Sequence, residues 1–171
     1  MLVGDTGSFK STLALGIAVC VQNSLPWHSL RTRACNVAIF NHEDGSGFKT
    51  RYLANVDHYE INEPALFWDS EVPNLLNNAE VNARISAMKD AGIGLVVIDT
   101  LAHAMPGADE NSAKEMGIAV DNLIRIKKQL NATVLVVHHT GKDPSKGARG
   151  SSSLKAAVDT EISITASRGV V

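Results

Sequence analysis

A short loop near the first residue of the chain carries the residue types that bind phosphate groups. Gly4, Lys10 and Ser11 fit the pattern G-x-x-x-x-G-K-[S/T], while Phe9 stands where that pattern has its second glycine. Gly4 and Gly7 allow backbone N–H groups to turn toward phosphate oxygens. The Lys10 ammonium can reach the β- and γ-phosphates of a nucleotide, and the Ser11 hydroxyl can contact Mg²⁺. These residue types at this spacing predict a phosphate site.

An apolar run at residues 13–21 follows the loop and predicts a helix. The positive end of the helix dipole would then face a bound anion, which favours phosphate binding. The alternative is a polar turn that caps an ordinary helix. On the first interpretation, the nucleotide-binding residues are Gly4, Asp5, Thr6, Gly7, Ser8, Phe9, Lys10, Ser11 and Thr12.

Two acidic side chains come at the ends of predicted strands. Asp99 directly follows the apolar run 93–98 and is typical of a Walker B carboxylate, which holds Mg²⁺ largely through water. Glu43 comes just after the run 37–40 and could polarise the water that attacks the γ-phosphate, with Asp44 as a competitor for that role. The alternatives are a capping or turn aspartate at Asp99 and a solvated acidic turn at Glu43.

Two adjacent histidines follow the apolar run 133–137. Neighbouring side chains of a strand point to opposite faces, so His138 and His139 are not expected to chelate one metal ion. We expect one to be packed and His139 to face the site, where it could bind the γ-phosphate and relay its loss to the next loop. The remaining histidines have no spacing signal and are expected in surface or packing positions: His28, His42, His58 and His103.

The glycine-rich loop at residues 141–150 carries three positive charges, Lys142, Lys146 and Arg149. This composition favours contact with an anion, either single-stranded nucleic acid or the phosphates of a neighbouring subunit. The alternative is an ordinary solvated loop.

Short apolar runs alternate with helical patterns along the chain, which is typical of an α/β fold with a mostly parallel sheet flanked by helices. Ser112 and Glu115 predict a capping box at the start of the strongest helix. The third strand is expected at the sheet centre and the last nearer an edge. The predicted strands cover residues 37–40, 65–68, 93–98, 133–137 and 161–164, and further helices are expected around residues 81–88, 116–130 and 151–158.

The composition narrows the class of protein. A chain of 171 residues suits a single domain over residues 1–171. The net charge of −2 excludes a general electrostatic attraction to nucleic acid, so any contact with nucleic acid must come from a local cluster of basic residues. No apolar run reaches membrane length, and Cys20 and Cys35 lack metal-type spacing, so we expect a cytoplasmic protein with two buried thiols.

Because only three residues precede Gly4 and the last residues resemble a strand, we expect a core fragment truncated at both ends.

Taken together, these motifs resemble a known family. The sequence is similar to the RecA-like ATPase domain of phage- and plasmid-encoded AAA-type proteins, the group that includes RepA-type hexameric replicative helicases. The likeness spans nearly the entire chain, and phenylalanine before the lysine of the phosphate loop is a familiar variant in this group. It rests on residues 7–11, 43, 98–101, 109–112, 138–142 and 149–154.

The resemblance implies a RecA-like P-loop core that binds ATP and Mg²⁺. It also implies that the loops after the Asp99 and His139 strands line the central channel of a ring. The finger that such rings supply to a neighbouring subunit's ATP would lie beyond the last residue, with Arg149 and Arg168 as weaker substitutes. The implied roles are ATP and magnesium binding by Lys10, Ser11 and Thr12, catalysis by Glu43, the Walker B function of Asp99 and γ-phosphate sensing by His139.

The function that the resemblance implies is an ATP-hydrolysing motor. Such a motor would be a DNA helicase or loader in phage or plasmid replication or recombination, acting on single-stranded DNA as a homo-oligomeric ring, with a hexamer favoured. Two alternatives are a small-molecule P-loop kinase and an assembly module that binds ATP without a motor role.

Overall fold

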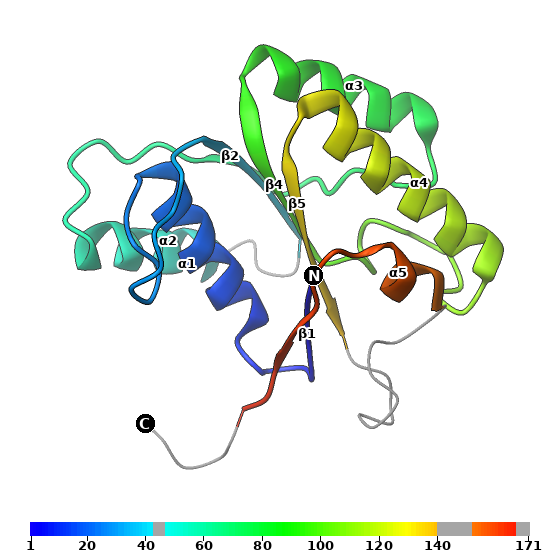
Figure 1. The fold of residues 1–171 in the computed structure, drawn as a ribbon, viewed down its shortest axis with the longest axis horizontal. Coiled ribbons are helices and arrows are strands. Elements are labelled where there is room, and N and C mark those ends of the chain that lie inside the picture. The colour runs from blue at the N-terminus through cyan, green and yellow to red at the C-terminus, as the bar shows by residue number, and fades with distance from the viewer. Residues whose placement is uncertain (43–46, 140–151, 167–171) are drawn as a thin grey trace.

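A computed structural model describes residues 1–42, 47–139 and 152–166 of the chain (Figure 1). Within these residues, six strands form one sheet in which every pairing is parallel, in the order β3-β2-β4-β5-β1-β6. The predicted α/β fold with a parallel sheet flanked by helices is therefore confirmed. The strands are β1 (Leu2–Gly4), β2 (Asn36–Asn41), β3 (Phe67–Asp69), β4 (Ile93–Asp99), β5 (Thr133–His139) and β6 (Ile162–Ile164).

The helices cover both faces of this sheet (Figure 1). On one face they are α1 (Lys10–Gln22) and α2 (Gly47–His58), and on the other they are α3 (Asn78–Asp90), α4 (Ala113–Leu130) and α5 (Ser152–Ala157). None of the helices in the described part of the chain is long and apolar enough to cross a membrane.

Strand β2 shows how one short sequence serves two cores. Val37 and Ile39 pack in the cluster that includes α1, whereas Ala38 and Phe40 pack in the cluster that includes α3 and α4. Because successive side chains of a strand alternate between faces, a run of apolar residues is required wherever both faces are covered. The same reasoning placed β4 at the centre of the sheet and β6 at its edge, and both placements are confirmed.

Helix α2 and the exact position of β3 were not expected from the sequence. Phe48 is the buried residue of α2, and its ring stacks on Trp68 of β3 with centroids 4.7 Å apart. A helix with so small an apolar face gives almost no periodic signal. Strand β3 covers Phe67–Asp69 rather than residues 65–68, because its register is set by pairing with Ala38–Phe40 of β2.

The predicted capping box at the start of α4 is only half correct. The Ser112 hydroxyl accepts a hydrogen bond from the backbone N–H of Glu115 at 3.4 Å, as expected. The Glu115 carboxylate, however, accepts from the N–H of Asp109 at 2.9 Å, and the N–H of Ser112 donates to the Asp109 carbonyl at 2.8 Å. Glu115 therefore fastens the preceding loop to the helix.

The two thiols differ in exposure, so the prediction of two buried cysteines is half wrong. Cys20 lies fully buried in α1, whereas Cys35 is partly exposed just before β2, and both are free thiols. Burial nevertheless raises the pKa of the Cys35 thiol, and nearby Arg33 opposes that rise.

Candidate functional site

A cavity of about 460 Å³ opens at the carboxyl end of β1. It is bounded by the loop that joins β1 to α1, by the first residues of α1 and by the end of β5. The structure thus brings most of the predicted phosphate loop together with one of the predicted histidines. The lining residues are Thr6, Gly7, Ser8, Phe9, Lys10, Ser11 and His139.

The N-terminus of α1 at this cavity has no side-chain cap. Phe9 occupies the capping position and makes no side-chain hydrogen bond there, and the first turn contains no acidic residue. The starts of α3 and α4 are different, because Asn77 and Ser112 accept hydrogen bonds from backbone N–H groups there. The uncapped N–H groups and the positive helix dipole make the start of α1 suited to an anion.

Lys10 is buried beside this helix start, with only 5% of its surface exposed. Its ammonium donates a hydrogen bond to the Asp5 carbonyl at 2.8 Å and lies 3.5 Å from the Ser8 hydroxyl. A buried ammonium needs such oxygen partners, because desolvation is otherwise costly. The loop therefore holds a positive charge at the base of the cavity, in a position to meet the oxygens of a phosphate.

The backbone explains why the phosphate-loop pattern has a glycine at the position of Phe9. Phe9 has φ 63° and ψ 22°, and Gly7 has φ 79°, so both lie in the left-handed region. Glycine enters this region at little cost, whereas a residue with a Cβ does not. The Phe9 side chain is 69% exposed, so its ring gains little from packing. At Phe9 the loop thus adopts a backbone conformation that favours glycine.

Gly4 has a different reason to be glycine. It ends β1, where it pairs with His139 on one side and Ile164 on the other. A Cβ at this position would clash with the backbone carbonyl of Ile164 and lie 2.7 Å from the Ser8 hydroxyl. Gly4 therefore permits the close approach of β6 and the phosphate loop, and it does not line the cavity itself. Asp5 and Thr12 are likewise absent from the cavity lining.

Asp99 ends β4 and is almost fully buried, at 2% exposure. Its carboxylate accepts a hydrogen bond from the side-chain amide of Asn41 at 2.6 Å, and the two residues are cross-strand neighbours at the ends of β4 and β2. Strand β5 separates β4 from β1, so Asp99 lies about 10 Å, or two strand spacings, from the strand that carries the phosphate loop. Such a separation can be bridged by a polyphosphate and its hydrated cation.

The two adjacent histidines face opposite sides of β5. His138 is 1% exposed and packed in the interior, whereas His139 is half-buried and lines the cavity beside the phosphate loop. This arrangement places one imidazole where it can contact a bound phosphate.

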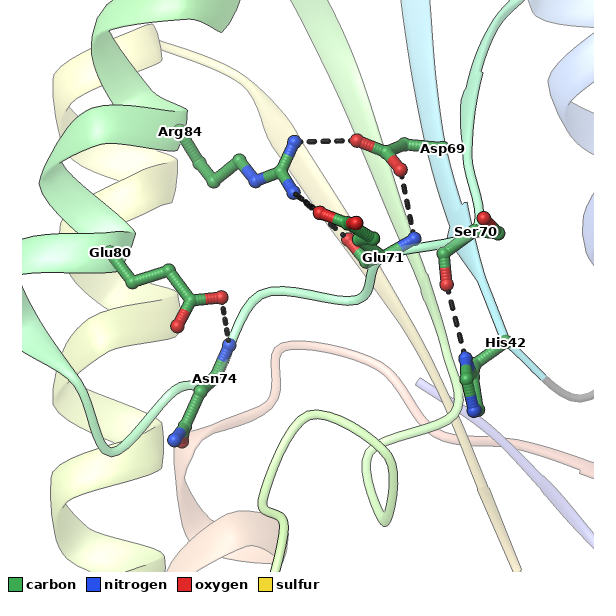
Figure 2. Close-up of polar contacts among 7 residues, drawn as sticks. All are labelled: His42, Asp69, Ser70, Glu71, Asn74, Glu80 and Arg84. Atoms are coloured by element: carbon green, nitrogen blue, oxygen red, sulfur yellow. Dashed lines mark hydrogen bonds and ion pairs between the residues drawn. The ribbon is translucent and has the colours of Figure 1, made fainter.

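Two histidines without a spacing signal in the sequence lie beside the end of β4. The rings of His42 and His103 have centroids 4.9 Å apart. His103 Nδ1 is 3.1 Å from the Thr100 hydroxyl, and His42 donates from Nδ1 to the Ser70 carbonyl at 3.2 Å (Figure 2). The pair links the ends of β2, β3 and β4, and only its three-dimensional proximity could have revealed it.

An ion-pair cluster fixes the end of β3 to α3. Figure 2 shows the Arg84 guanidinium, which comes from α3, directed toward the carboxylates of Asp69 and Glu71. The same guanidinium lies 5.6 Å from the centre of the Phe40 ring in β2. Arg84 therefore holds the sheet edge next to the β2 end without reaching the cavity.

Some of the predicted residues lie outside the described residues. They are the carboxylates Glu43 and Asp44, the basic residues Lys142, Lys146 and Arg149 of the glycine-rich loop, and Arg168. Their predicted roles stay predictions.

One residue in contact with a predicted site residue was missed from the sequence. Asn41 looks like an ordinary polar residue at the end of an apolar strand, yet it contacts Asp99 directly. A polar side chain that ends a buried strand next to a predicted acidic strand end is a signal that could have identified it.

The comparisons with known proteins agree with this arrangement. A family model described as "AAA domain" matches residues 1–145 of the chain. None of the curated proteins compared with the chain matches it. The matched segment includes β1 with its phosphate loop, β4 with Asp99 and β5 with His139. The chain therefore belongs to the AAA domain family, whose members are P-loop ATPase-type domains.

Proposed function

We propose that this domain binds and hydrolyses ATP. The observation that carries the proposal is the cavity at the uncapped start of α1, where Lys10 supplies a buried positive charge. Family membership and the parallel sheet support an ATPase-type domain. Asp99, two strands away, supplies the carboxylate that such a site needs.

The proposed role of each site residue is consistent with its position. The N–H groups at the start of α1 would bind phosphate oxygens, and the Lys10 ammonium would leave the Asp5 carbonyl to contact the β- and γ-phosphates. His139 would contact the γ-phosphate from the other side of the cavity. Ser11 and Asp99 fit a magnesium ion, because their side chains offer the oxygen ligands that Mg²⁺ prefers. When bound, Mg²⁺ would supply positive charge that offsets the negative charge of the triphosphate.

We further propose that hydrolysis requires Glu43 and is coupled to single-stranded DNA. The support for these finer roles is the sequence alone: the position of Glu43 after β2, the charges of Lys142, Lys146 and Arg149, and the resemblance to phage and plasmid replicative helicases. The proposed assembly is a homo-oligomeric ring, most simply a hexamer. In the ring, the basic loop would face the DNA or a neighbouring subunit's ATP.

The test is ATP binding and phosphate release by the purified protein, with and without single-stranded DNA. Lys10→Ala should abolish both ATP binding and hydrolysis, whereas Lys89→Ala, which removes an exposed charge at the end of α3, should change neither. A rate that rises with DNA supports the motor role. A rate that stays flat with DNA in an oligomeric sample would refute the DNA role. Wild-type protein that binds no ATP would refute the proposal as a whole.

A further inference from the structure

Asn41 contacts Asp99 but has no part in the proposed binding of ATP. It ends β2, it is 1% exposed, and it is the cross-strand neighbour of Asp99. A buried side-chain amide is costly unless its hydrogen-bonding groups are used, so such a residue at the end of an apolar strand calls for an explanation. The four residues of β2 before Asn41, at positions 37–40, are apolar and buried, which makes the cost at Asn41 stand out.

The orientation of the Asn41 amide is fixed by its neighbour. The amide nitrogen faces Asp99, because Asn41 Nδ2 donates a hydrogen bond to Asp99 Oδ2 at 2.6 Å. The amide oxygen is the other hydrogen-bonding atom of this side chain, and it lies two bonds from the nitrogen that contacts Asp99. This oxygen is buried and has no hydrogen-bond partner among the residues that the structure describes.

We propose that Asn41 is a positioning residue of the magnesium site. Its amide nitrogen orients the Asp99 carboxylate, and its amide oxygen accepts a hydrogen bond from a water molecule of the magnesium hydration shell. The inference rests on the proposed ATP site. Mg²⁺ dehydrates reluctantly and keeps several waters when one or two carboxylates and a nucleotide's phosphates bind it, so acceptors for these waters are part of a complete site. An amide oxygen suits this task because it accepts without adding charge.

The chain contains a matched asparagine for comparison. Asn122 of α4 is 3% exposed, and its amide nitrogen donates to the Leu75 carbonyl at 2.7 Å and to the Asn78 side chain at 3.0 Å. It joins α4 to the start of α3, on elements that do not line the cavity. Replacing either asparagine by leucine removes buried hydrogen bonds at nearly constant volume. Only the replacement at Asn41 should alter the response to magnesium.

The experiment measures the affinity of a fluorescent ATP analogue first in EDTA and then across a magnesium titration. In EDTA, Asn41→Leu should bind the analogue as wild type does, because the phosphate loop is untouched. The magnesium concentration at half-maximal enhancement should rise at least about tenfold, the effect expected when a residue that supports a metal ligand is lost. Asn122→Leu should titrate at the wild-type magnesium concentration even if it unfolds at a lower temperature.

The outcomes separate this inference from the proposed function. Wild-type protein that binds no analogue refutes the ATP site itself. Wild-type binding that depends on magnesium, with the same magnesium midpoint in Asn41→Leu, overturns the role of Asn41 alone. If Asn41→Leu fails to fold by circular dichroism, Asn41→Ser takes its place. The serine is too short to hold Asp99 and reach the water together, so the same rise in the magnesium midpoint is expected, and its absence would overturn the proposal.

Discussion

Replacing Phe9 by glycine tests whether the phosphate loop is strained where its sequence departs from the pattern. The left-handed conformation of Phe9 costs a residue with a Cβ about 1–2 kcal/mol. Glycine removes that cost but adds about 0.4–1 kcal/mol through the greater freedom of the unfolded chain. Phe9→Gly should therefore be more stable than Phe9→Ala, which keeps the Cβ, by roughly 0.5–1 kcal/mol.

The contribution of the ring is estimated separately. Burying a whole phenylalanine side chain stabilises a protein by about 1.5–3 kcal/mol. Because Phe9 is 69% exposed, its ring contributes about a third of that, or roughly 0.5–1 kcal/mol. Phe9→Ala should lose this amount relative to wild type, and Phe9→Gly should regain it through relief of strain and so unfold close to wild type.

The assay is urea denaturation of wild type, Phe9→Ala and Phe9→Gly, combined with the affinity for an ATP analogue. Both variants should bind the analogue within about threefold of wild type, because the backbone N–H groups and Lys10 are unchanged. A glycine variant less stable than the alanine variant would refute the assignment of strain. Lost binding in the glycine variant alone would show that the loop needs the stiffness of a residue with a Cβ, and lost binding in both would show that the ring contacts the nucleotide.

Three further predictions concern the frame around the site. Gly4→Ala should lower the stability by about 1–3 kcal/mol, because its Cβ clashes with the Ile164 carbonyl; an unchanged melting temperature would show that β6 moves freely. Arg84→Met should cost about 1 kcal/mol, since its partly buried ion pair with Asp69 is lost; a loss that is unaffected by high salt would argue against an electrostatic cause. Cys35 in the folded protein should be alkylated by iodoacetamide half-maximally at a higher pH than in urea, because burial raises its pKa and the thiolate is the nucleophile; equal profiles for its peptide by mass spectrometry would contradict this.

Strands and loops with strong local signals could be predicted from the sequence. The runs that became β4 and β5 are long and apolar because helices cover both faces, and the phosphate loop has its own residue pattern. Short edge strands such as β3 carry too few residues for a reliable pattern, so their position depends on pairing with a neighbour. Helix α2 was missed because its buried face is reduced to Phe48.

The contacts within the candidate site could be predicted only in part. The alternation of side chains on a strand correctly separated His138 from His139. The contact between Asn41 and Asp99 depends on the register of two strands that are far apart in sequence, and the sequence alone does not set that register. The contact between His42 and His103 depends in addition on the path of the turn after β4. Local sequence patterns identify candidate site residues, whereas strand pairing and the paths of the turns determine which of these residues are in contact.

The position of β1 in the sheet affects which amide hydrogens exchange through local opening of the fold. Strand β1 has three residues and lies between β5 and the equally short β6, which forms one edge of the described sheet. Short strands at a sheet edge exchange their amide hydrogens through local opening that costs far less than global unfolding. Since Gly4 and the phosphate loop depend on these strands, a bound nucleotide would slow amide exchange in β6 as well as in its own loop. Amide exchange in β6 would thus report the occupancy of a cavity that β6 does not line.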